Sequence, residues 1–279
     1  MPFFDTPEPI SATIRLDLGS VRITGGKRVD TVVEVRPSND RRESDVRAAE
    51  QTQVTYSDGE LQVRAPKQRS LFGRGGSVDI MVELPAGSRV HGTAAMADFR
   101  CRGRLGECGF RTSYGDIELD QAGALQLTTA YGDVTVERAT GPAEVTTGSG
   151  AVRIGGIDGT AVIKNGNGDT EIGEVTGGLR LKAANGGISV DRALAVVVAR
   201  TANGDIRIGE VARGSVELES AYGELEIGIR RGTAAWLDVH SNHGTLHSRL
   251  GSFAGPAESD ETVEVRARTG YGDILVRHA

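Results

Sequence analysis

The sequence predicts an all-β fold, a parallel β-solenoid in which each coil of about 18 residues contributes two short strands. Three observations lead to this prediction. A glycine recurs at nearly constant spacing through most of the chain, and apolar residues alternate with polar ones on both sides of it. Glycine is also abundant, at 39 of 279 residues, while aromatic side chains make up 4%. Thin, repetitive coils need many tight turns and few large rings.

The recurring glycine, called the corner glycine below, separates the two strands of each coil. Successive corner glycines are 17, 18, 18, 18, 18, 19, 21 and 28 residues apart. A period held over several units indicates a repeat architecture, in which stacking buries the apolar face that one unit cannot bury alone. The corner glycines are Gly115, Gly132, Gly150, Gly168, Gly186, Gly204, Gly223, Gly244 and Gly272.

Apolar side chains occupy fixed columns relative to the corner glycine. Around Gly204, the aliphatic residues Ile206 and Ile208 follow and Val197 precedes, with the charged Arg207 between the first two. This period of two predicts half-buried strands rather than helices. We therefore expect about ten rungs, each pairing with the next at about 4.8 Å.

The predicted organisation has two parts in one continuous fold. Residues 1–90 lack the clean period but contain strand-like segments, so we expect an irregular β-rich cap with one short helix near 42–51, capped by Ser44. Residues 91–279 carry the solenoid repeats, and a loop inserted at 251–262 accounts for the longest gap. A cap at a solenoid end protects unpaired strand edges.

The residue before each corner glycine is expected to stack on its equivalent in the next rung. Asparagines in this column predict an amide ladder, and tyrosines are good interface anchors. We therefore predict a binding edge along the turns, and no catalytic or metal site. Its residues are Tyr114, Tyr131, Asn167, Asn185, Asn203, Tyr222 and Tyr271.

Acidic residues after several corner glycines allow two interpretations. Stacked carboxylates could bind calcium, as Asp169 and Asp205 illustrate, but aspartate is also favoured at turns through its bonds to backbone. We favour turn chemistry. His240, His243 and His247 lie close in sequence, but the column assignment points His240 and His247 outward from different faces, which disfavours zinc.

Other features also favour a protein without catalytic chemistry. Cys101 and Cys108 fall at inward positions and are expected to be small buried hydrophobes. No nucleophile elbow, phosphate-binding loop or dinucleotide fingerprint occurs. We predict a non-enzymatic scaffold or protein-interaction module without a cofactor. The alternative is a carbohydrate-active or calcium-dependent binding protein that uses the glycine–aspartate turn edge, and end-to-end self-association is a third possibility.

Charge and composition restrict the partners. A formal net charge of −6 argues against a nucleic-acid binder. The basic stretch at 64–74 is expected to be a solvated loop. No apolar run is long enough to span a membrane, and the first residues do not resemble a secretory signal, so we expect an unknown protein partner in the cytoplasm.

Several segments of the sequence resemble a known bacterial family, the "putative adhesin" or toast-rack β-strand-repeat domain of unknown function, in its actinobacterial form without a signal peptide. The resemblance covers nearly the whole chain. It implies a single β-solenoid fold and brings no catalytic motif. The name adhesin implies export, and this chain departs from that in lacking a signal segment. The segments that carry the resemblance are DTPEPIS (5–11), DTVVEVRPS (30–38), RSLFGRGGSVD (69–79), AMADFRC (95–101), GTAVIKNGNGD (159–169) and ETVEVRARTGYGDI (261–274).

Overall fold

The structure is a computed structural model that describes residues 2–67, 75–250 and 261–279. The chain forms two compact units, Met1–Thr140 and Gly141–Ala279. Both are built of strands, and the described residues contain one helix. The expected division at residue 90 and the continuity of the fold stay predictions. The basic stretch lies outside the described residues at 68–74, as does most of the expected loop, at 251–260.

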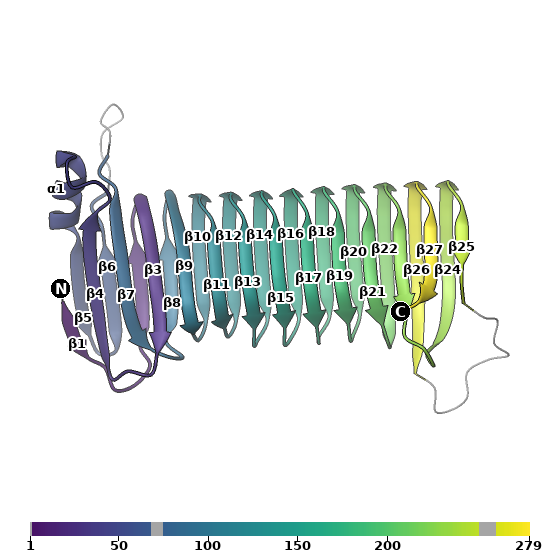
Figure 1. The fold of residues 1–279 in the computed structure, drawn as a ribbon, viewed down its shortest axis with the longest axis horizontal. Coiled ribbons are helices and arrows are strands. Elements are labelled where there is room, and N and C mark those ends of the chain that lie inside the picture. Colours follow the sequence, from purple (N-terminus) through teal and green to yellow (C-terminus); the bar gives the residue numbers. More distant parts are fainter. Residues whose placement is uncertain (1, 68–74, 251–260) are drawn as a thin grey trace. The chain divides into compact units, whose positions relative to one another are not determined.

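The second unit is a stack of rungs, each made of two strands that meet at a corner glycine (Figure 1). The first strands of the rungs are β14 (Ala143–Ser149), β16 (Ala161–Asn167), β18 (Leu179–Asn185), β20 (Val197–Asn203), β22 (Gly214–Tyr222), β24 (Ala234–His243) and β26 (Thr262–Tyr271). The second strands are β15 (Val152–Ile157), β17 (Thr170–Val175), β19 (Ile188–Ala193), β21 (Ile206–Val211), β23 (Leu225–Ile229), β25 (Leu246–Ser248) and β27 (Ile274–His278).

First strands pair with first strands and second strands with second strands, always in parallel. Asn167 of β16 is in register with Asn185 of β18, and Ile172 of β17 with Val190 of β19. The inward columns close a core between the two strand layers, and Ile172, Val190 and Ile208 are all buried. The predicted parallel β-solenoid is confirmed.

The last rung of the chain is not the last rung of the stack. β26 pairs with β22 on one side and with β24 on the other, and β27 lies likewise between β23 and β25 (Figure 1). The expectation that each rung stacks on the next in sequence is therefore wrong here. Val265 and Ala267 of β26 are therefore completely buried, because neighbouring rungs cover them on both sides, whereas β24 has no fully buried residue. The open end is taken by the rung whose second strand, β25, carries Ser248 where β27 carries Val276.

The first unit contains the N-terminal strands and four further rung strands. In chain order its elements are β1 (Phe3–Asp5), β2 (Ser11–Arg15), β3 (Leu18–Gly26), β4 (Asp30–Pro37), α1 (Glu43–Gln51), β5 (Gln53–Ser57), β6 (Glu60–Arg64), β7 (Val78–Pro85), β8 (Arg89–Thr93), β9 (Met96–Arg104), β10 (Cys108–Tyr114), β11 (Ile117–Ala122), β12 (Leu125–Tyr131) and β13 (Val134–Ala139).

The N-terminal rung of this unit is also inserted. β2 lies between β6 and β8, and β3 lies between β7 and β9, all in parallel. Antiparallel strands then end the unit, because β5 pairs with β6, and β4 pairs with both β7 and β1. The rung of β2 and β3, the first along the chain, therefore has paired strands on both sides.

The expected helix is present, but its predicted cap is wrong. α1 begins at Glu43, Arg42 occupies the capping position without a side-chain bond, and Ser44 lies inside the helix. The Asp45 carboxylate accepts the backbone N–H of Ser77 at 3.1 Å. This tertiary bond holds the first turn of the helix, and a local capping rule does not foresee it.

Large side chains fill the core where the backbone makes room for them. The rings of Phe99 and Phe110 are completely or almost completely buried and lie 4.8 Å apart. Gly92 sits beside both, and a Cβ there would lie 2.4 Å from the Phe99 ring. The glycine on β8 therefore allows two phenylalanines in a core that is otherwise mainly aliphatic.

Candidate functional site

The turn edge is defined here as the row of side chains that directly precede the corner glycines. Corner geometry fixes this row, because the corner glycines other than Gly244 have positive φ, from 127° at Gly168 to 156° at Gly223. Side chains are strongly disfavoured in that conformation. A Cβ on Gly186 would also lie 2.2 Å from the carbonyl oxygen of Gly168.

In the first unit, the turn edge is aromatic. The rings of Tyr114 and Tyr131 stack with centroids 4.9 Å apart and planes 7° apart. Met96 is in register with Tyr114 and is also exposed. The two tyrosines are 49% and 55% exposed, so each presents about half of its surface while stacking restricts its motion.

In the second unit, the turn edge begins with Ser149, which is in register with Asn167, and continues with amides. Asn185 Nδ2 donates to Asn167 Oδ1 at 2.7 Å, and Asn203 Nδ2 donates to Asn185 Oδ1 at 2.9 Å. The predicted amide ladder is confirmed by these two bonds. Asn185, in the middle, both donates and accepts along the stack, whereas Asn167 accepts from the ladder and donates to Gly148 O at 3.4 Å. The three side chains are exposed, so further donors and acceptors of the ladder are accessible to solvent.

The same row continues with rings. Asn203 is in register with Tyr222, whose ring stacks on Tyr271 at 5.0 Å, and Tyr271 in turn stacks on His243 at 4.4 Å. Sequence order predicts the row Tyr222, His243, Tyr271. Because the rung of β26 is inserted, the row is instead Tyr222, Tyr271, His243. The structure thus brings Asn167, Asn185, Asn203, Tyr222 and Tyr271 into one row of the second unit, and Tyr114 and Tyr131 into a pair in the first.

Hydroxyl groups hold the turn from inside. Thr129 donates to Gly115 O at 3.1 Å, Ser220 to Gly204 O at 3.0 Å, and Thr269 to Gly223 O at 2.9 Å. Each bond links a rung to the corner carbonyl of its neighbour. These hydroxyl groups satisfy carbonyl groups of the turn backbone.

The acidic column bonds to turn backbone, as the turn interpretation expects, but to the turn of the adjoining rung rather than to its own. The Asp116 carboxylate accepts the N–H of Asp133 at 2.8 Å, and Asp169 accepts the N–H of Gly187 at 2.8 Å. Asp205 does the same for Glu224 at 2.7 Å. These carboxylates connect successive turns, and no group of three or more metal-ligating side chains occurs within the described ranges.

The three histidines and the two cysteines do not come together in one site. His240 lies on β24, His243 at the turn edge and His247 on β25, and all three are exposed. Cys101 and Cys108 are buried. Burial raises the pKa of the Cys108 thiol to about 12 and raises that of Cys101 well above its ordinary value, so both thiols stay protonated at neutral pH.

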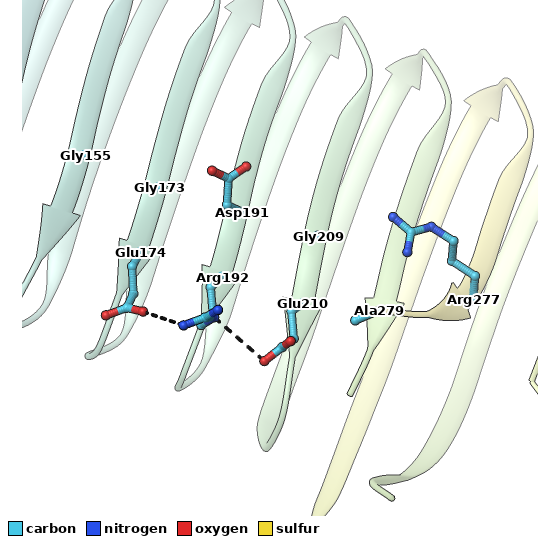
Figure 2. A pocket seen from close by; sticks show the side chains of 9 residues that line it. All are labelled: Gly155, Gly173, Glu174, Asp191, Arg192, Gly209, Glu210, Arg277 and Ala279. Atoms are coloured by element: carbon cyan, nitrogen blue, oxygen red, sulfur yellow. Dashed lines mark hydrogen bonds and ion pairs between the residues drawn. The ribbon is translucent and has the colours of Figure 1, made fainter. Parts of the chain in front are cut away.

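A shallow hollow on the second strand layer of the second unit was not foreseen from the sequence (Figure 2). Gly155, Gly173 and Gly209 line it, and its volume is about 480 Å³. A row of ion pairs borders it: Arg192 reaches Glu174 at 3.1 Å and Glu210 at 3.8 Å. The signal in the sequence was a second glycine column, five residues after the corner glycine.

Packing explains those glycines. A Cβ on Gly173 would lie 2.2 Å from Gly155 O, and one on Gly209 would lie 2.6 Å from Asp191 O. The hollow therefore follows from the close approach of backbones, and Glu174, Arg192 and Glu210 on its border are already paired. No feature of the hollow marks it as a ligand-binding site.

Stacked two-strand rungs with glycine corners and a side-chain ladder define the class of this protein, a β-solenoid. The Toastrack DUF4097 family profile matches residues 12–278, and the chain belongs to that family. No curated protein matches the chain. Among the described residues, no helix is long and apolar enough to cross a membrane.

Three solved structures show distant likeness. A "putative cell adhesion protein" from Clostridium sporogenes is 13% identical, over 100% of this chain and 98% of that one, with a TM-score of 0.23. A "putative adhesin" from Bacteroides fragilis is 12% identical over 99% and 95%, with a TM-score of 0.36. A "putative lipid binding protein" from Parabacteroides distasonis is 9% identical over 98% and 95%, with a TM-score of 0.41. Likenesses this distant say nothing about what the chain binds.

Proposed function

We propose that this protein is a non-enzymatic β-solenoid scaffold whose turn edge binds a protein partner. The observation that supports this most is the set of half-exposed, stacked tyrosines, Tyr114 with Tyr131 and Tyr222 with Tyr271. Aromatic side chains are scarce in the chain, and an ordered, exposed ring loses little conformational entropy on binding.

The rest of the surface supports a site at the edge more than one on a strand face. Outward side chains on the faces are tied into ion pairs between rungs, such as Arg153 with Glu171 at 3.5 Å and Arg230 with Glu210 at 3.1 Å. Such pairs bind these charges to neighbouring rungs, which makes them less available for recognition. The asparagine ladder between the faces offers amide donors and acceptors for a partner's backbone.

The test is capture of a partner by crosslinking, followed by binding of the purified partner to the purified chain. Cytosolic and envelope fractions of the native host are treated separately, which also tests the expected cytoplasmic location. Tyr114→Ala/Tyr131→Ala and Tyr222→Ala/Tyr271→Ala are compared with wild type. We expect at least one pair to weaken the purified complex about tenfold or more, as removal of interface anchors does.

The matched control is Arg153→Ala/Glu171→Ala, which removes two partly exposed side chains from a strand face. It should bind as wild type does. All variants should keep the wild-type circular dichroism spectrum and unfolding midpoint within a few degrees. A partner that binds both tyrosine variants as tightly as wild type would show that the turn edge is not the binding surface.

A further inference from the structure

The rung of β24 and β25 ends the stack of the second unit, as the described residues have it. There β24 pairs with β26 and β25 with β27, and no further described strand joins either one. Its inward column is uncovered: Leu246 is 49% exposed, while Ile274, its equivalent one rung inside, is 1% exposed. Leu237 and Val239 are partly exposed, although Val265 and Ala267 beside them are completely buried.

Backbone direction gives this apolar end hydrogen-bonding groups that have no partner among the described residues. In the regular rungs, inward residues donate N–H to the following rung, as Leu179 does to Val196 O at 2.8 Å and Ile274 to Thr245 O at 3.0 Å. Ala234 of β24 lies an odd number of positions from the inward residues Leu237 and Val239, and it donates back to Glu261 O of the preceding rung at 2.9 Å. By strand alternation, the N–H and C=O groups of Leu237, Val239 and Ser241 point away from β26.

The strand edge is complementary to itself. If two copies of β24 pair antiparallel about Val239, Val239 faces Val239 of the other copy, and Leu237 faces Ser241. These are the residues whose backbone groups point outward, so the three facing pairs would form about six hydrogen bonds. On the outer face, Asp238 of each copy then faces His240 of the other, within reach of a cross-strand carboxylate–imidazole contact.

We infer that a second copy of this chain docks on β24, forming a two-fold dimer through antiparallel edge pairing. Charge selects the register, because shifting the centre to Asp238 would set the two Asp238 carboxylates against each other. Arg268 already approaches Asp238 at 3.6 Å from the inner side, which leaves the outer side of that carboxylate for the histidine. The dimer covers Leu237 and Val239 and satisfies an otherwise open strand edge.

One strand pair buries a small area, so the dimer belongs to the weak class of interfaces and its dissociation constant is high. Sedimentation velocity of the full chain from low micromolar to near-millimolar concentration measures it. We expect a reversible monomer–dimer equilibrium in wild type. Val239→Pro removes an outward N–H but no bond to β26, so it should remain folded and monomeric throughout the range.

A charge exchange tests the register independently. His240→Asp places like charges opposite each other and should weaken the dimer about tenfold or more. Asp238→His/His240→Asp restores opposite pairs, with the new carboxylate in register with Arg268, and should recover most of the affinity. A wild-type chain that stays monomeric throughout, or a dimer that survives in folded Val239→Pro, would overturn the proposal. Failure of the exchange to restore dimers would overturn the register.

Discussion

Replacing Gly186 and Gly187 by alanine, one at a time, should change stability in opposite directions. The two glycines are neighbours at one corner of the second unit. Gly186 has a φ of 129°, and an added Cβ would lie 2.2 Å from Gly168 O and 2.6 Å from Gly168 C. Gly187 has no such conformation, and the nearest atoms to its added Cβ are Asp169 Oδ1 at 3.6 Å and Asp205 O at 3.8 Å, which is ordinary contact.

The expected magnitudes follow from these distances. Gly186→Ala costs about 1–3 kcal/mol of backbone strain. It must also displace the adjoining rung, weakening bonds such as Gly168 N–H to Asn185 O, now 2.9 Å, at about 1 kcal/mol. We expect a total loss of roughly 2–4 kcal/mol. Gly187→Ala keeps its N–H bond to Asp169 and should gain about 0.5 kcal/mol, because alanine has less freedom in the unfolded chain.

Urea unfolding followed by far-ultraviolet circular dichroism measures both changes. Equal slopes for the two variants and wild type allow midpoints to be compared as free energies. The two variants should differ by at least about 2.5 kcal/mol, from the sum of the effects above. If Gly186→Ala is as stable as Gly187→Ala, the corner does not require glycine, and the argument from the neighbouring carbonyl is wrong.

Three further predictions concern the ladder, a buried amide and a thiol. Asn185→Ala breaks both ladder bonds, which are solvent-exposed, and should lower the free energy of unfolding in urea by about 1 kcal/mol; no loss would mean the ladder does not contribute. Asn165 is 3% exposed, and its Oδ1 has no hydrogen-bond partner. The double variant Asn165→Thr/Thr170→Val restores the residue types common in these two columns and should raise the free energy of unfolding by about 1 kcal/mol. A lower unfolding midpoint would contradict this. The pKa of the Cys108 thiol is about 12 in the folded chain and 9.0 ordinarily, so above about pH 9 the thiol ionises in the unfolded chain before it does in the folded one. The contribution of Cys108 to the free energy of unfolding is therefore complete below about pH 9 and falls by about 1.4 kcal/mol per pH unit as the pH rises toward 12. Cys108→Ala should therefore lose less stability between pH 8 and pH 10 than wild type, and an unchanged difference would refute the burial argument.

The sequence by itself determined the rung. Strand alternation, corner glycines and the amide ladder are contacts between equivalent positions, so a period near 18 predicts them without knowledge of the whole fold. Asn167, Asn185 and Asn203 illustrate this, because neighbouring repeats place them in register whatever else the chain does. The same reasoning failed at Ser44, where a contact from Ser77, distant in sequence, fixes the start of the helix.

Only the tertiary structure decided the order of the rungs at the ends of the chain. Every rung carries the same columns, so the repeat pattern is equally satisfied whether β24 or β26 follows β22. The second strands differ where the first strands do not: Val276 of β27 is buried between two rungs, and β25, which carries Ser248 in that column, takes the open end. That choice places Tyr271 between Tyr222 and His243, and it creates the exposed strand edge from which the dimer is inferred.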